Sequence, residues 1–140
     1  MIIGICGLIG AGKDTIADHS FVKLSFADKL KDSVATMFDW NRDLLDGKTE
    51  QSRKWREQMD PFWSMELKHE VTPRLVLQKF GTECMRDGFH DGIWVSLVKK
   101  KLQDNPHINW VIPDVRFENE ADMIQELGGE VWWVKRGQLP

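Results

Sequence analysis

The sequence has little of what marks several common classes of protein. Its 140 residues include no tyrosine and two cysteines, Cys6 and Cys84, which lack metal-ligand spacing. This excludes a disulfide framework and a cysteine-based zinc site, and it fits a reducing, cytoplasmic setting. No apolar run is long enough to span a bilayer, and the short N-terminal run leads straight into glycines, unlike a signal peptide.

An excess of charge of one sign is also lacking. The chain has 19 Lys and Arg against 22 Asp and Glu, a net charge of −3, with the two signs interspersed. No basic stripe or polybasic tail therefore predicts a nucleic-acid or membrane partner. The four histidines share no spacing and are interpreted as non-catalytic. We expect small-molecule partners; the oligomeric state stays open, a homodimer included.

The N-terminus carries the most informative motif. An apolar run, Ile2–Cys6, is typical of a buried strand, and Gly7, Gly12 and Lys13 fit the spacing G-x-x-x-x-G-K before a helix. This is the arrangement of a P-loop, whose backbone N–H groups and lysine bind nucleotide phosphates. A plain glycine turn between strand and helix is the alternative. The nucleotide-binding residues expected here are Gly7, Gly10, Ala11, Gly12, Lys13, Asp14 and Thr15.

One position departs from the usual P-loop. Ser or Thr commonly follows the lysine and binds Mg²⁺, but here Asp14 follows Lys13 and Thr15 comes one place later. Either Asp14 or Thr15 acts on the metal, directly or through water. Asp14 could instead be a helix N-terminal acid stabilised by the helix dipole.

The remaining pattern alternates strands with helices. Strands are expected at Ile2–Cys6, Val22–Phe26, Trp110–Pro113 and Val131–Val134, and helices at Ala27–Trp40, Gln51–Met59, Thr72–Met85, Ile93–Gln103 and Glu118–Leu127. Turns are expected at Asn41–Gly47 and Gly88–Gly92, with Asp60 and Pro61 ending a helix. This order predicts an α/β fold with a mainly parallel sheet. Because ligands bind at the carboxyl ends of such strands, residues after strand ends should share one rim: Asp28, Asp114, Arg116 and Arg136.

We expect one domain over residues 1–140, with two irregularities. The helix expected from Lys13 to Ser20 is short for a crossover between parallel strands, which suggests missing residues between Ser20 and Phe21. The chain stops at Pro140, directly after a strand, so its C-terminus can be incomplete. Trp132 and Trp133 should point to opposite faces of their strand.

Several blocks of the sequence resemble the phage-type deoxynucleoside monophosphate kinases. These blocks are Gly12–Thr15, Phe26–Asp32, Thr72–Glu83, Asp87–Val95 and Pro113–Glu120. The resemblance implies a three-layer P-loop fold of the nucleoside monophosphate kinase type. It also implies transfer of the γ-phosphate of ATP, with Mg²⁺, to a (deoxy)nucleoside 5′-monophosphate. Residues 41–71 would form a helical insertion on the acceptor side, either a mobile region that closes or a solvent-facing segment.

On this interpretation Lys13, Asp114 and Arg116 are the catalytic candidates. Lys13 would hold the β- and γ-phosphates, and Asp114 would orient Mg²⁺ through water or bind the acceptor, unless it is a loop acid. Arg116 and Arg136 could clamp phosphate, and Arg136 could instead stack on adenine. Either arginine could also be an ordinary surface residue.

The acceptor candidates lie mostly on helices. Arg74 would grip the acceptor phosphate, and Gln78, one turn later, could read the base edge, unless both belong to a polar helix face. Asp28 and Lys29 begin a helix where the acceptor could enter, and Trp94 lies in a block that fits the resemblance.

Two other functions compete with this one. A P-loop kinase for another small acceptor, such as dephospho-coenzyme A, would share the nucleotide site. A nucleotide-binding switch without transfer activity is less favoured, because the sequence has no Asn-Lys-x-Asp motif of the GTPase type.

Overall fold

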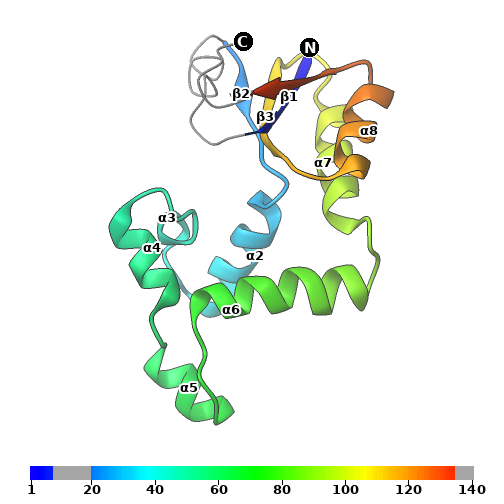
Figure 1. The fold of residues 1–140 in the computed structure, drawn as a ribbon. Coiled ribbons are helices and arrows are strands. Elements are labelled where there is room, and N and C mark those ends of the chain that lie inside the picture. Colours follow the sequence, from blue (N-terminus) through cyan, green and yellow to red (C-terminus); the bar gives the residue numbers. More distant parts are fainter. Residues whose placement is uncertain (8–19, 135–140) are drawn as a thin grey trace. The chain divides into compact units, whose positions relative to one another are not determined.

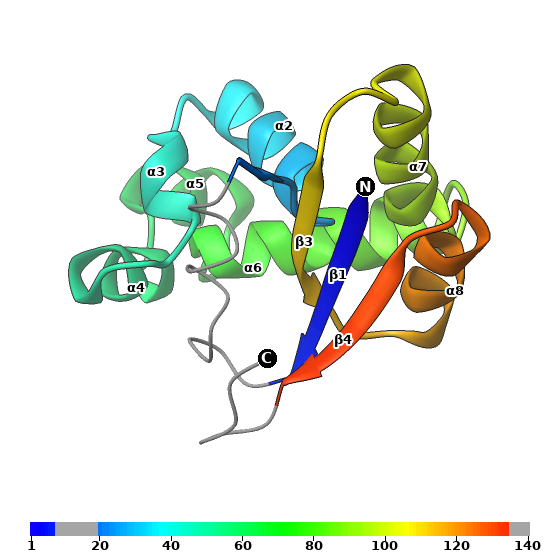
Figure 2. The ribbon, with the colours of Figure 1, turned by 90° about the horizontal axis from the view of Figure 1, so that it is seen from above.

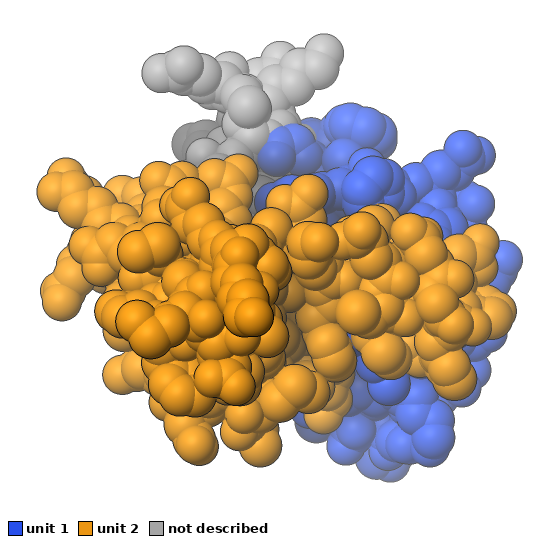
Figure 3. All heavy atoms as spheres, turned by 90° about the horizontal axis from the view of Figure 1, so that it is seen from below, with its two compact units in different colours: residues 1–26, 94–140 blue, residues 27–93 orange. Residues whose placement is uncertain are grey.

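The computed structural model describes residues 1–7 and 20–134 (Figure 1), and the chain divides into two compact units. The sheet unit comprises residues 1–26 and 94–140, and the helical unit comprises residues 27–93 (Figure 3). The expected insertion, residues 41–71, falls inside the helical unit. The expectation of one domain over residues 1–140 remains a prediction.

Among the described residues, four parallel strands form the sheet in the order β2-β3-β1-β4. They are β1 (Ile2–Gly7), β2 (Val22–Lys23), β3 (Trp110–Val115) and β4 (Glu130–Val134). Strand β1 lies between β3 and β4 (Figure 2), with Ile2 opposite Trp110 and Ile5 opposite Trp132. Interior parallel strands are covered on both faces, which accounts for the apolar run in β1. The predicted α/β fold with a parallel sheet is confirmed.

Strand β2 is shorter than the predicted Val22–Phe26. The N–H of Leu24 still donates to the carbonyl of Val111 at 3.0 Å. The N–H of Phe26, however, donates to the side chain of Asp114 rather than to a strand carbonyl. The hydrogen-bond ladder between β2 and β3 therefore ends before Phe26, whose N–H is bound by the Asp114 carboxylate.

The two faces of the sheet are packed differently. Helices α7 (Ile93–Asp104) and α8 (Glu118–Glu126) cover one face (Figure 2), where residues such as Val98, Ile112 and Ile124 form a buried cluster. The other face carries Ile3, Ile5 and Val111, with Phe21 and Trp132 packed against them. Trp132 and Trp133 follow the predicted alternation, since Trp132 joins this cluster while Trp133 is 76% exposed.

The helical unit is built from short helices around an aliphatic core with aromatic rings packed against it. They are α2 (Asp28–Phe38), α3 (Arg42–Leu45), α4 (Glu50–Glu57), α5 (Pro61–Leu67) and α6 (Pro73–Gln78), with the π-helix η1 (Lys79–Asp87) continuing from α6. Val34, Leu45 and Leu77 are buried at its centre. The rings of Phe38 and Trp40 stack on this core, with their centroids 4.7 Å apart. Burial of large apolar side chains is thus the main stabilising contribution.

Of three predictions about helix boundaries, two are confirmed and one is wrong. The helix expected at Gln51–Met59 ends at Glu57, before Asp60 and Pro61, and these two residues also begin α5, where the Asp60 carboxylate accepts the N–H of Trp63 at 2.9 Å as an N-cap. The expected turn Asn41–Gly47 contains the single-turn helix α3. Thr72 caps α6 as predicted, accepting the N–H of Leu75 at 3.0 Å. None of the helices that the structure describes is both long enough and apolar enough to cross a membrane.

Candidate functional site

The carboxyl edge of β1 and β3 brings predicted site residues together within the sheet unit. Strand β1 ends at Gly7, whose φ of 131° lies where side-chain-bearing residues are rarely found. Gly7 pairs with Val134, and Cys6 pairs with Val115 of β3. The expected nucleotide loop therefore leaves the sheet at the edge where parallel-sheet proteins bind ligands. Gly10, Ala11, Gly12, Lys13, Asp14, Thr15 and Arg136 lie outside the described residues.

Asp114 occupies an irregularity in β3. Between the pairs Gly4–Ile112 and Cys6–Val115 the register shifts, so β3 has one extra residue, at Pro113 and Asp114. Proline has no N–H for the ladder, and a bulge re-aims the neighbouring side chain. The Asp114 carboxylate accepts the N–H of Phe26, with its two oxygens at 3.3 and 3.1 Å from that nitrogen. This bond fixes a carboxylate beside the end of β1.

Arg116 follows β3 on a loop that a buried glutamate holds in place. Oε1 of Glu120 accepts the backbone N–H groups of Arg116 and Phe117, at 2.8 and 3.0 Å. Glu120 is 6% exposed, whereas the side chain of Arg116 is exposed to solvent. The backbone is thus fixed while the guanidinium can reach a ligand. Sequence reasoning missed Glu120, although a Glu three residues after a helix N-cap is a known capping pattern.

Trp94 lies in the first turn of α7 and is 8% exposed. Its side chain is therefore mostly enclosed by the protein. A role in substrate binding remains a prediction from the sequence block that contains it.

In the helical unit, Asp28 belongs to a charge network centred on Arg42. The guanidinium of Arg42 contacts Asp32 at 2.6 Å, Asp46 at 2.7 Å and Asp28 at 3.6 Å. Burial alone would lower the pKa of Arg42, but its hydrogen bonds with Asp32 and Asp46 raise it. Lys29, the other acceptor candidate on α2, is exposed. Asp28 is thus already engaged by a cation, while Lys29 faces solvent.

Asp46 is the best-shielded carboxylate of this network. Nζ of Lys31 lies 3.4 Å from its Oδ1, in addition to the contact with Arg42. Burial would raise the pKa of Asp46, but the hydrogen bond and charge of Arg42, together with Lys31 and Lys48, lower it. The network favours the ionised carboxylate and ties the end of α3 to α2.

Arg74 and Gln78 lie one turn apart on α6, as predicted, and both are exposed. Nη1 of Arg74 pairs with Oε1 of Glu57, on α4, at 2.8 Å. Gln78 is the last residue of α6 before the π-helix η1, and such helices are frequent at functional sites. In η1, a Cβ on Gly81 would lie 2.9 Å from Cδ2 of Leu30, so glycine permits close packing on α2.

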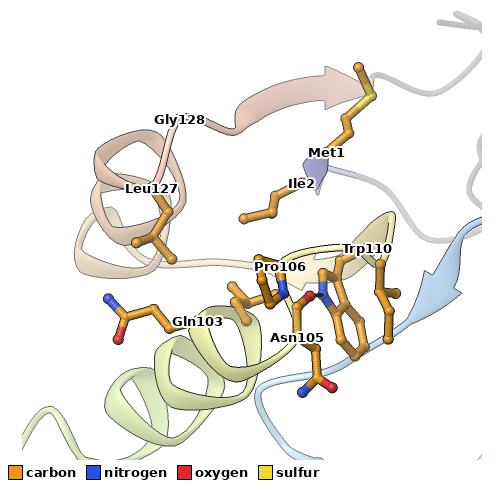
Figure 4. A pocket seen from close by; sticks show the side chains of 10 residues that line it. Met1, Ile2, Gln103, Asn105, Pro106, Trp110, Leu127 and Gly128 are labelled. Atoms are coloured by element: carbon orange, nitrogen blue, oxygen red, sulfur yellow. Dashed lines mark hydrogen bonds between the residues drawn. The ribbon is translucent and has the colours of Figure 1, made fainter.

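A cavity of about 340 Å³ opens at the other edge of the sheet (Figure 4). Met1 and Ile2, from the start of β1, line it with Trp110, from the start of β3. Parallel sheets bind their ligands at the carboxyl ends of the strands, and this cavity lies at the amino ends. It is therefore separate from the edge that carries Gly7 and Asp114.

Comparison with known proteins gives concordant matches. Residues 47–139 match the model of a family described as deoxynucleotide monophosphate kinase. The chain is 37% identical over 152 residues to the "Putative deoxynucleotide monophosphate kinase" of Acanthamoeba polyphaga mimivirus, spanning 97% of this chain and 74% of the relative. It is 39% identical over 57 residues to the deoxynucleoside-5′-monophosphate kinase of Escherichia phage T5, spanning 40% of this chain and 22% of that protein.

Proposed function

The chain belongs to the deoxynucleotide monophosphate kinase family, and we propose that it transfers the γ-phosphate of ATP to a (deoxy)nucleoside 5′-monophosphate, yielding the diphosphate. Family membership makes the protein a phosphotransferase acting on nucleotides. One structural observation supports the finer proposal most. Gly7, Asp114 and Arg116 meet at the carboxyl edge of a parallel sheet, where an ATP phosphate chain would lie.

On the ATP side, the chain's task is to position phosphates and neutralise their charge. The backbone N–H groups from Gly7 to Thr15 and the ammonium of Lys13 would hold the β- and γ-phosphates. The guanidinium of Arg116, on a loop anchored by Glu120, would bind the oxygens of the transferring group. Arg136 would bind ATP from the end of β4, through its phosphates or by stacking on adenine.

Asp114 suits a magnesium site that retains water. Mg²⁺ in phosphotransferases is commonly held by one or two carboxylates, substrate phosphates and several waters. Each carboxylate oxygen can accept more than one hydrogen bond, so the bond from Phe26 does not prevent Asp114 from binding metal-bound water. Asp14 or Thr15 would be the other protein residue that binds the metal, directly or through water. When bound, the ion would neutralise negative charge on the phosphates.

On the acceptor side, Arg74 would bind the 5′-phosphate and Gln78 the base edge. The contact between Arg74 and Glu57 holds the guanidinium near the surface of α6, and an incoming phosphate can replace an exposed carboxylate. Asp28, Lys29 and Trp94 are assigned to this site on their sequence blocks. Residues 41–71 would close over the acceptor as part of a single kinase domain.

The cellular setting proposed is the cytoplasm, or the host cytoplasm if the chain is phage-encoded. Partners would be nucleotides rather than nucleic acid or membrane. Association into a homodimer is a further expectation, which sedimentation velocity at several concentrations checks directly.

The decisive experiment is a coupled assay of ADP release with ATP, Mg²⁺ and each nucleoside monophosphate in turn, ribo and deoxy. We expect turnover with one or a few deoxynucleotides. ATP binding without turnover on any of them would reject the proposed reaction. Dephospho-coenzyme A, included as an acceptor in the same assay, would then separate another small-molecule kinase from a nucleotide-binding switch.

A further inference from the structure

Arg56, near the end of α4, is partly buried and has an unsatisfied donor. Its Nε is buried and, among the described residues, has no hydrogen-bond acceptor. Leaving a buried charged donor without a partner is unfavourable, and such groups are scarce in folded proteins. A water molecule or a ligand oxygen would supply the missing acceptor.

The turn before α4 is shaped around this guanidinium. Gly47 has a φ of +67°, and a Cβ at that position would overlap Nη1 of Arg56. The neighbouring Arg53 donates from its Nη1 to the carbonyl of Gly47 at 3.2 Å. The end of the Arg56 side chain therefore lies against this turn, whose positive φ favours glycine.

A second arginine shares this neighbourhood. Burial lowers the pKa of Arg56, and the positive charge of Arg74 on the neighbouring α6 lowers it further. Glu57, which follows Arg56 in the chain and pairs with Arg74 at 2.8 Å, and Asp46 both act in the opposite direction and raise the pKa of Arg56. The pair between Glu57 and Arg74 brings α6 beside the end of α4, so an anion bound there would be stabilised by the charges of both arginines.

We propose that Arg56 and Arg74 together bind the 5′-phosphate of the acceptor nucleotide. The inference rests on the proposed function and adds a phosphate-binding residue that the sequence does not single out. A phosphate monoester carries a charge of about −1.5 to −2 at pH 7 and three strong acceptor oxygens, enough for two guanidinium groups. Arg74 turns from Glu57 to the phosphate, while Arg56 supplies donors already placed at the Gly47 turn.

The test compares Arg56→Gln with Lys54→Gln. Both variants remove one positive charge from α4, but Lys54 is exposed and pairs with Glu50. Its loss should leave the kinetics unchanged. For Arg56→Gln we expect the KM of the best deoxynucleoside monophosphate to rise about 30-fold, equivalent to about 2 kcal/mol. The KM of ATP should change less than about twofold, because uniform loss of acceptor binding leaves the ATP site intact.

A second measurement isolates the phosphate group. Equilibrium dialysis compares each deoxynucleoside monophosphate with its unphosphorylated deoxynucleoside. The wild-type protein should prefer the phosphorylated form, and Arg56→Gln should lose most of that preference. An acceptor KM and a preference that match those of Lys54→Gln would overturn the inference.

Two complications have defined outcomes. If Arg56→Gln lacks a cooperative thermal transition, Arg56→Lys replaces it, since lysine keeps the charge but not the bidentate fork. A rise in the acceptor KM with kcat retained then supports the inference, and an unchanged KM overturns it.

If the wild-type protein phosphorylates no monophosphate, the proposed function fails. The dialysis with dAMP, dGMP, dCMP and dTMP is then the measurement that tests whether Arg56 and Arg74 bind phosphate. Absence of a phosphate-dependent preference in the wild type also overturns the inference.

Discussion

The two units of the molecule hold their candidate site residues by different means. In the sheet unit, carboxylates bind backbone N–H groups: the buried Glu120 holds the loop of Arg116, and the partly buried Asp114 binds the N–H of Phe26. In the helical unit, Arg74 is held by a pair with Glu57 in which both side chains are 64% exposed. Backbone anchors fix geometry, whereas exposed ion pairs contribute little to stability and exchange partners readily.

This difference matches the two tasks of the proposed reaction. The phosphates of ATP must be aligned for in-line transfer, which favours a site fixed before substrate arrives. An acceptor must enter and leave on each turnover, which favours cations whose protein partners a phosphate can displace. The fixed contacts in the sheet unit and the exchangeable ones in the helical unit meet these two needs.

The largest expected effect belongs to the nucleotide loop. Lys13→Ala should lower kcat by about 1000-fold, because a charge that stabilises the transferring phosphoryl group is lost. Folding should be retained, as judged by an unchanged thermal transition. Turnover near the wild-type level in a folded Lys13→Ala protein would contradict the P-loop assignment. It would also contradict the proposal that the sheet unit provides a preformed ATP site.

A matched pair of glutamate variants tests the comparison directly. Glu120→Ala leaves two backbone N–H groups without their acceptor and should lower the free energy of unfolding by about 2 kcal/mol. Glu57→Ala removes an exposed pair and should change it by less than about 0.5 kcal/mol. Urea unfolding of both variants gives the two values. Equal losses of unfolding free energy would mean that the Glu120 hydrogen bonds and the Glu57 ion pair stabilise the protein to the same extent.

Arg74→Ala should act on the acceptor alone. Removing a charged hydrogen-bond donor to phosphate should raise the acceptor KM by about 20-fold while the KM of ATP stays within about twofold. Steady-state kinetics with each substrate varied in turn measures both constants. An equal rise in the two KM values would remove Arg74 from the acceptor site and weaken the functional distinction between the units.

The sheet unit was more predictable from sequence than the helical unit, for physical reasons. A strand buried on both faces, such as β1, has a continuous apolar sequence, so its first and last residues can be predicted closely. Asp60 and Pro61 were predicted only to end a helix, but the same two residues also begin the next one, since Asp is a good N-cap and Pro a good first-turn residue. The sequence of a charged helix such as α4 does not show which of its cationic side chains is partly buried. The contact with Gly47 in the structure identifies Arg56 as that residue. The role of Glu120 could have been predicted from its position three residues after the helix N-cap, but only once the N-cap residue itself had been identified.

The last expected effect concerns the charge network of Arg42, which is partly buried in the helical unit. The pKa of Asp46 is lowered in the folded protein, against the opposing effect of burial, by Arg42 and nearby lysines. A lowered pKa stabilises the fold above the unfolded value and loses that contribution as the pH falls through the folded value. Asp46→Asn should therefore cost about 1 kcal/mol of unfolding free energy at pH 7.

That difference from the wild type should begin to shrink below about pH 4, where the unfolded chain takes up a proton at this residue, and should be lost once the folded carboxylate is protonated as well. Urea unfolding at pH 7, 5 and 3 measures it, with Asp122→Asn, an exposed position on α8, as the matched control. A difference that stays constant down to pH 3 would show that Asp46 acts through packing rather than charge. A difference that disappears with acid would place the Arg42 network between the two extremes, more firmly fixed than Arg74 and Glu57 but dependent, like them, on ionised side chains.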